Sequence, residues 1–328
     1  MRDERFDFYK GFLIWGVIWG HTITAMLNGQ NNDICIHSFF RTYDMPFFMA
    51  ISGYFLSFSI KRYNSYTLIK NKFTTIAIPG IIWATLLSLG HDNPFGSFYF
   101  IWAIFWSSIM MIVINRVINN KTFQILIYII IILLLHFIEV QPYRIYNLPY
   151  LFPFFILGFY AWHLIEFGRK HFLIVLPVFV TLLCFWRTDY TIWNIGANFF
   201  GGFNLMIQAI TLRFFIAITG IIVMSVCFDI IFRFLTEYNP QIKTFIVLFG
   251  RETLGLYILQ GFVVFRLLGY IVKYIERLFG YNVFASNHML LGYVVTPLTS
   301  MIIIIVLFYF ITIIKKYKYF RPLFGFKI

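Results

Sequence analysis

Long apolar segments separated by short polar connections follow one another along almost the whole of this chain. This pattern strongly restricts the possible fold class, because about twenty apolar residues are enough to cross a lipid bilayer as a helix. Hydrophobic residues make up 60% of the 328 positions and charged residues only 12%, which excludes an ordinary soluble protein. We expect an all-α, polytopic integral membrane protein whose helices enclose a polar cavity. About ten transmembrane helices are expected, at residues 9–27, 39–58, 73–90, 97–115, 123–139, 149–166, 171–186, 205–232, 252–272 and 288–314.

The distribution of Lys and Arg predicts how these helices are oriented. Of the 26 Lys and Arg residues, Arg144, Arg187, Lys273 and Arg277 fall in connections on one side, and Arg41, Arg213 and Arg266 lie within or at the rim of spans. The remaining 19 fall in connections and termini on the opposite side. Because Lys and Arg concentrate in cytoplasmic connections, we expect a multi-pass protein of the cytoplasmic (inner) membrane with both termini in the cytoplasm.

The net charge of +13 follows mostly from this topology. Membrane lipid is therefore the expected partner of the basic residues, and nucleic acid is not. The three cysteines are too few and too scattered for a disulfide framework or a metal cluster, so no metal is expected. We find no cleavable signal peptide and no soluble segment, and we expect residues 1–328 to form a single transmembrane domain without a fused soluble domain.

The first span combines an apolar sequence with titratable residues. Lys10 and His21 are eleven positions apart, which in a helix places them on one face about 16 Å apart along the axis. Asp7 falls close to the same line. Polar groups deep in a bilayer are costly and mark a functional site by default, so Asp7, Lys10 and His21 are the candidate catalytic residues.

Several motifs of this sequence resemble those of one known family. Arg5-Phe6-Asp7-Phe8-Tyr9-Lys10-Gly11 is followed by His21, with ten residues between Lys10 and the histidine. The second span carries Met45-Pro46-Phe47-Phe48-Met49-Ala50-Ile51-Ser52-Gly53-Tyr54, and a late span opens with Gly250-Arg251-Glu252-Thr253-Leu254-Gly255-Leu256-Tyr257-Ile258-Leu259. Lys70 and Lys72 before Pro79, Trp102, and the run Pro153 to Gly158 also agree in order. The chain resembles membrane acyltransferase family 3, which includes O-acetyltransferases of bacterial surface polysaccharides in the cell envelope.

Two positions depart from the family pattern. The family often has histidine where this chain has Asp44, and commonly has histidine after the Tyr-Ile-Leu run, where Gln260 stands here. A mechanism that needs either histidine is therefore in doubt for this chain. Asp44 is a possible partner for the second nitrogen of His21, where a carboxylate would fix the tautomer of the imidazole.

The resemblance implies O-acetylation of a glycan hydroxyl, with acetyl-coenzyme A (acetyl-CoA) as the donor. His21 would act as a general base towards the hydroxyl, or as a nucleophile that holds the acetyl group briefly. The sequence leaves both routes open, along with a purely structural histidine. Arg62, Lys70 and Lys72 are the candidate donor-binding residues, since cations suit the phosphates of coenzyme A; the alternative is that they only contact lipid headgroups.

The remaining cavity candidates are Ser52 and Arg213, together with Asp44 and Gln260. Ser52-Gly53 either brings two helices together or exposes backbone to a substrate. Arg213 lies well within its span and needs a partner there. A transporter or flippase of a polysaccharide or lipid-linked sugar is the alternative function, using the same cavity without chemistry. It differs from an acyltransferase in tolerating a polar substitute for His21.

Overall fold

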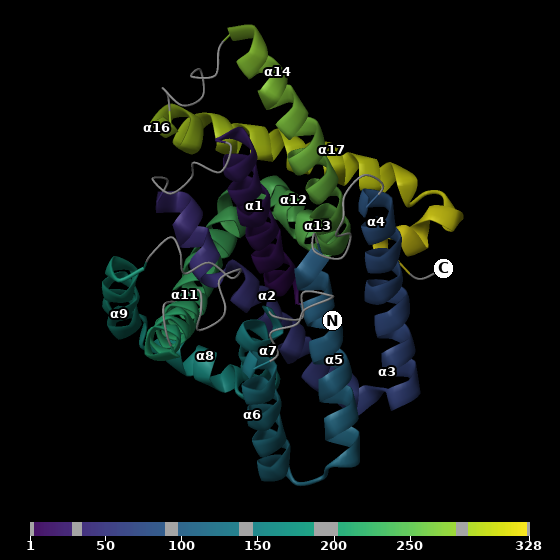
Figure 1. Cartoon of the computed structure of the whole chain (residues 1–328), viewed down its shortest axis with the longest axis vertical. Helices are drawn as coiled ribbons and strands as arrows, with labels where there is room; N and C mark the ends of the chain where they lie inside the picture. Colours follow the sequence, from purple (N-terminus) through teal and green to yellow (C-terminus); the bar gives the residue numbers. More distant parts are fainter. Residues whose placement is uncertain are drawn as a thin grey trace. The chain divides into compact units, whose positions relative to one another are not determined.

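The computed structural model describes residues 3–27, 35–88, 98–137, 147–186, 203–279 and 288–326. Every regular element in these ranges is helical, which confirms the all-α prediction (Figure 1). The chain divides into two compact units. Unit 1 comprises Met1–Asp44 and Met224–Phe324, and unit 2 comprises Met45–Val223 and Gly325–Ile328. Two helices, α2 (Cys35–Arg62) and α11 (Phe203–Tyr238), contribute to both units.

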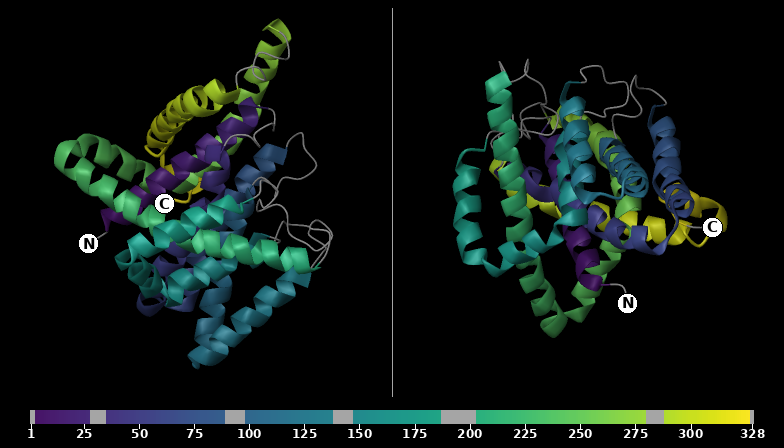
Figure 2. Two further views of the ribbon diagram at one scale, coloured as in Figure 1. Left: turned by 90° about the vertical axis from the view of Figure 1, so that its left-hand side faces the viewer. Right: turned by 90° about the horizontal axis from the view of Figure 1, so that it is seen from below.

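Unit 1 is organised around α1 (Glu4–Met26), which begins at Asp3, whose side chain accepts a hydrogen bond from the Arg5 backbone N–H. It packs along α12 (Pro240–Arg251) and α17 (Thr296–Ile314); the yellow α17 runs beside the purple α1 in Figure 2. The other elements of this unit are α13 (Thr253–Phe262), η4 (Val263–Leu268), α14 (Gly269–Phe279), α16 (His288–Leu290), η5 (Leu291–Val295) and η6 (Lys318–Phe324). Of these, η4 and η5 are π-helical turns that continue into the neighbouring α-helices.

The contact between α1 and α12 depends on glycine. A β-carbon on Gly250 would lie 1.6 Å from the backbone oxygen of Asp7, and one on Gly11 would lie 2.2 Å from that of Ile246. No other residue fits at such distances, so the two backbones touch directly. This contact fixes the part of α1 that carries Asp7 and Lys10.

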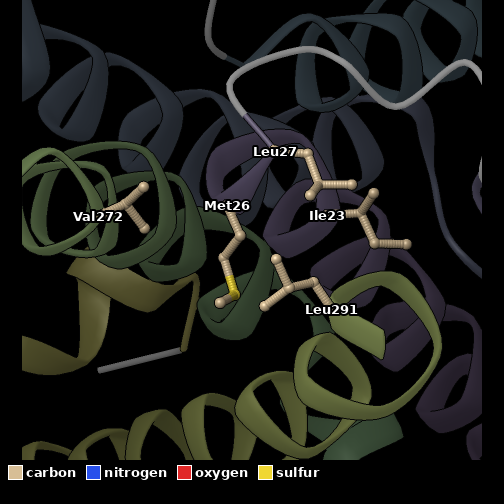
Figure 3. Close-up of a cluster of buried hydrophobic side chains, with 5 residues drawn as sticks. All are labelled: Ile23, Met26, Leu27, Val272 and Leu291. Carbon is tan, nitrogen blue, oxygen red and sulfur yellow. The ribbon is translucent and has the colours of Figure 1, made fainter. Parts of the chain in front are cut away.

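The other end of α1 is fixed by an apolar cluster (Figure 3). Ile23, Met26 and Leu27 pack against Val272 of α14 and Leu291 of η5, and all five side chains are buried. Burial of a side chain of this size contributes about 1.5–3 kcal/mol. The last part of α1, beyond His21, is therefore held in place against two later segments of the chain.

Unit 2 is a set of shorter helices. They are α3 (Ser65–Lys72), η1 (Phe73–Ala77), α4 (Ile78–Ser88), α5 (Tyr99–Val117), α6 (Lys121–Phe137), α7 (Leu148–Tyr160), α8 (Trp162–Lys170) and α9 (Phe172–Cys184), with the adjoining parts of α2 and α11. A β-carbon on Gly53 would lie 2.0 Å from the backbone oxygen of Phe155, and one on Gly158 would lie 1.9 Å from that of Ala50. Of the two interpretations of Ser52-Gly53, close helix packing between α2 and α7 is therefore the one that the glycine contacts support.

Each of the ten expected spans coincides with helix, but fewer are long and apolar enough to cross a membrane. Among the described residues these are Tyr99–Val117, Asn204–Tyr238, Thr253–Phe279 and Leu291–Ile314, and the pair α7–α8, bent by 81°, makes up to five. Lys10, His21 and the threonines of α1 lower its mean hydropathy. The structure thus supports a helical membrane protein, while the count of ten spans and an enclosed polar cavity are not confirmed.

Candidate active site

His21 is hydrogen-bonded to a side chain more than two hundred residues away in the sequence. Its Nδ1 lies 2.8 Å from the amide oxygen Oε1 of Gln260 on α13. An amide oxygen only accepts, so Nδ1 carries the proton and donates it. A neutral imidazole protonated at Nδ1 keeps its lone pair on Nε2. Gln260 therefore holds His21 in the tautomer whose Nε2 is able to take a proton from a substrate.

The surroundings of His21 fix its helix and its ring. The ring of Phe265 in η4 lies 4.9 Å from the imidazole, centroid to centroid. Two and six residues earlier on α1, Trp19 Nε1 donates to Thr296 Oγ1 at 2.9 Å and Trp15 Nε1 donates to Ser300 Oγ at 3.1 Å. These bonds to α17 set the rotation of α1 about its axis, and with it the direction in which His21 points.

A second histidine lies beside this site. His37, on the first turn of α2, is buried, and its Nε2 is 3.3 Å from Thr24 Oγ1 on α1. The Thr24 hydroxyl also donates to the Gly20 carbonyl oxygen at 3.0 Å. The guanidinium of Arg41, one turn further along α2, interacts electrostatically with both His21 and His37. His37 is not among the site residues predicted from the sequence; its one-turn spacing from Arg41 is the signal that could have indicated it.

Asp7 and Lys10 form a separate cluster near the start of α1. Lys10 Nζ lies 2.7 Å from Asp7 Oδ1, and Arg251 Nε lies 3.6 Å from Asp7 Oδ2. Nearby, Glu4 pairs with Lys243 at 2.9 Å. Asp7 and Lys10 thus bond to each other and to α12, about three helical turns (~16 Å) before His21. The structure does not bring them together with His21 as one catalytic group.

Comparison with known proteins shows which family this chain belongs to. The profile of the acyltransferase 3 family, described as an acyltransferase domain, matches residues 3–317. The chain belongs to this family. Nodulation protein NolL of Mesorhizobium japonicum (strain LMG 29417 / CECT 9101 / MAFF 303099) is 28% identical over 305 residues, covering 81% of this chain and 78% of NolL. Nodulation protein NolL of Sinorhizobium fredii (strain NBRC 101917 / NGR234) is 27% identical over 182 residues, and the match spans 48% of each protein. No solved structure matches the chain.

Membership of the acyltransferase 3 family gives the reaction class, acyl transfer, and the two family departures can now be placed. Gln260 takes the position next to the catalytic candidate His21 and makes the tautomer-fixing bond that we had suggested for Asp44. Asp44 is buried at the end of the unit 1 part of α2, where its carboxylate interacts electrostatically with Tyr43. The amide of Gln260 therefore accepts the hydrogen bond from His21 that we expected the Asp44 carboxylate to accept.

The other predicted site residues belong to unit 2. Ser52 is half-buried next to the glycine contact described above. Arg213 is 1% exposed, and its guanidinium carbon lies 4.2 Å from the centre of the Tyr150 ring. A cation over an aromatic face is stabilised by the ring electrons. Tyr150 is therefore an interaction partner of Arg213 within its predicted span.

The three candidate donor-binding residues of unit 2 differ from one another. Arg62 and Lys70 are exposed, whereas Lys72 is half-buried at the end of α3. Burial lowers the pKa of Lys72 from its ordinary 10.5 to about 8. Among the described residues its ammonium has neither an ion pair nor a hydrogen bond. Of the three candidate donor-binding residues, Lys72 is therefore the one whose charge an anionic ligand would stabilise most.

Proposed function

We propose that this member of the acyltransferase 3 family transfers an acetyl group from acetyl-CoA to a hydroxyl of an extracytoplasmic or lipid-linked glycan. The observation that carries the proposal is the hydrogen bond from His21 Nδ1 to Gln260, because it leaves Nε2 as a base. Histidine is the side chain that most often acts as a general base in enzymes. The remainder of the site supports this role by holding the ring in place.

In the proposed reaction the acceptor hydroxyl oxygen attacks the carbonyl carbon of the thioester, and His21 Nε2 takes the hydroxyl proton. The resulting tetrahedral species collapses, and the carbon–sulfur bond breaks. The coenzyme A thiolate leaves and receives the proton from the imidazolium, which restores His21. An ester and free coenzyme A are the products, so no other reactant is needed.

The donor in this proposal approaches from the cytoplasm, and the acceptor from the other side. Basic residues on the cytoplasmic side of the predicted topology would attract the phosphates of acetyl-CoA. These residues include Lys10, Arg62, Lys70 and Lys72. With both termini in the cytoplasm, His21 lies beyond the middle of the first span. The proposal thus places the chemistry in the half of the membrane nearer to an extracytoplasmic glycan.

Gln260 provides a test of the tautomer argument. Replacing Gln260 by leucine removes the acceptor for the Nδ1 proton, so the imidazole no longer favours a basic Nε2. We expect the rate of acetyl transfer to fall by about 10–100-fold, as for other groups that orient a functional histidine. Replacement by glutamate retains an acceptor and should preserve more activity than leucine. Equal rates for wild type and Gln260→Leu would show that the bond has no such role.

Lys72 predicts a dependence of donor affinity on pH. A charge-assisted hydrogen bond is worth about 1.5–3 kcal/mol, so Lys72→Gln should weaken acetyl-CoA binding by roughly ten- to hundred-fold at pH 7. With its pKa near 8, Lys72 is charged below this pH and loses its charge above it. The wild-type affinity should therefore be full below pH 8 and fall as the pH rises through that value.

Calorimetry with acetyl-CoA on the purified chain measures this dependence. Lys72→Arg keeps its charge at pH 9.5 and should not show the fall, and Lys61→Gln, which alters an exposed lysine of α2, is the matched control. If the wild type binds equally well at pH 7 and pH 9.5, or if Lys72→Gln binds normally, Lys72 does not hold the donor.

The proposed function itself is tested with membranes that contain the chain. Acetyl-CoA labelled in its acetyl group is added to them, and label is measured in extracted glycolipid. We expect label to appear with these membranes and not with membranes from a deletion strain. A deletion strain that loses glycan export, while membranes of both strains transfer no label, would favour the transporter.

A further inference from the structure

Arg41 stands out among the residues around His21. His37 and Arg41 lie one turn apart on α2, and this face of α2 is held against α1 by the contact between His37 Nε2 and Thr24 Oγ1. A β-carbon on Gly20 would lie 3.6 Å from His37 Cδ2, an ordinary van der Waals distance, so the His37 ring lies against α1. Arg41 thus starts from a fixed backbone position beside the helix that carries His21.

The charge of Arg41 has no counter-charge in the described part of the chain. Its side chain is half-buried, and none of the described residues forms an ion pair or hydrogen bond with its guanidinium. The groups on which it acts are the two imidazoles, His21 and His37. A cation at the start of a predicted span, facing imidazoles in place of carboxylates, has unused capacity to stabilise negative charge.

Negative charge develops next to His21 in the proposed reaction. When the hydroxyl adds to the thioester carbonyl, the carbonyl oxygen becomes an oxyanion, and the carbon that bears it lies within reach of the oxygen that His21 deprotonates. A stabilising donor must therefore lie near His21 without being bonded to it. Arg41 meets this requirement by position, because it lies one turn after His37 on α2, His37 contacts Thr24, and Thr24 lies one turn after His21 on α1, while Gln260 occupies Nδ1.

We propose that Arg41 is a further catalytic residue, whose guanidinium stabilises the oxyanion formed on the acyl carbonyl oxygen during transfer. This inference rests on the proposed function and adds the second charged group of the reaction. His21 Nε2 takes the proton of the attacking hydroxyl, and Arg41 donates hydrogen bonds to the oxyanion. As the carbon–sulfur bond breaks, the oxyanion returns to a carbonyl and the proton passes from His21 to the thiolate.

The test separates catalysis from binding. Membranes with the full chain receive labelled acetyl-CoA and a glycolipid extract from a deletion strain as acceptor, and kcat and the KM for acetyl-CoA are measured. For Arg41→Gln we expect kcat to fall by about 10²–10³-fold, as after loss of one oxyanion donor, with KM and the calorimetric affinity for acetyl-CoA unchanged. Arg41→Lys keeps the charge and should recover part of kcat.

The matched control is Arg266→Gln, which removes a cation from the same unit. Arg266 lies 5.9 Å from the centre of the Phe262 ring. The Arg266→Gln variant should keep the wild-type kcat. Wild-type kcat in Arg41→Gln, or a raised KM with unchanged kcat, would overturn the assignment. If Arg41→Gln fails to fold, full kcat in Arg41→Lys would also overturn it, since a lysine cannot reproduce the guanidinium geometry. An inactive wild type would instead refute the proposed function.

Discussion

Replacing His21 by glutamine should abolish acetyl transfer while the chain still folds and enters the membrane. Glutamine retains a hydrogen-bonding side chain next to Gln260, but it cannot take up a proton at neutral pH. A positioned general base contributes about 10²–10⁴-fold to a rate, and we expect a loss of at least this size. His21→Ala should fail equally. Transfer of labelled acetyl to glycolipid measures the loss, and binding of acetyl-CoA should stay near the wild-type value.

His163→Gln is the matched control for this prediction, because it replaces an exposed imidazole of α8 and should leave transfer unchanged. Near-normal transfer by His21→Gln would remove His21 from the mechanism, and Asp7 and Asp44 would be the next residues to test. Loss of glycan export on deletion of the chain but not in His21→Gln, without any transfer in the wild type, would indicate a transporter.

Alanine at Gly158 or Gly53 should strongly destabilise unit 2. At each position the new β-carbon would fall within about 2 Å of a backbone oxygen, that of Ala50 or Phe155. Backbone atoms cannot turn aside as a flexible side chain can, so α2 and α7 would have to separate. Overpacking usually costs about 1–3 kcal/mol, and we expect a cost at or above the upper end. Thermal unfolding of the purified chain in detergent would show a lowered midpoint.

Gly269 of α14 supplies the control, because a β-carbon there meets nothing within 4 Å. Gly269→Ala should be neutral or slightly stabilising, since alanine favours helix by about 1 kcal/mol over glycine. If all three alanine variants unfold at the wild-type temperature, the close approach of α2 and α7 does not exist in the folded protein.

The first helix illustrates what the sequence is able to predict. A continuous helix over Glu4–Met26 requires only local information, and the apolar run with its Asp3 cap supplies it. The helical period then places Lys10 and His21 on one face. The same motif led to the family, which the profile match over residues 3–317 confirms.

The partner of His21 illustrates the limit. From the sequence, Gln260 is only a cavity candidate and a departure from the family pattern, which commonly has histidine there. Its role depends on a contact between α1 and α13 that joins residues 239 positions apart, and no local pattern encodes such a contact. Likewise the helical spacing places Asp7 close to the line of Lys10, while the ion pair between them and the approach of Arg251 are seen only in the structure.

The count of ten spans is not confirmed, for a related reason. Hydropathy along residues 149–166 is continuous, yet the helix breaks at Ala161 and bends by 81°. Lys10, His21 and the threonines of α1 weaken the apolar signal of that helix. A count by apolar length therefore depends on a few polar residues and on bends that hydropathy does not show.

The central claim, that the chain adds acetyl groups to a glycan and needs His21 to do so, is tested most directly by mass spectrometry of surface glycans. Three strains are compared: one with the wild-type chain, one without it, and one with His21→Gln. We predict a glycan heavier by one acetyl group in the first strain alone. Identical glycan masses in all three strains, with the chain present in the membrane, would contradict the claim.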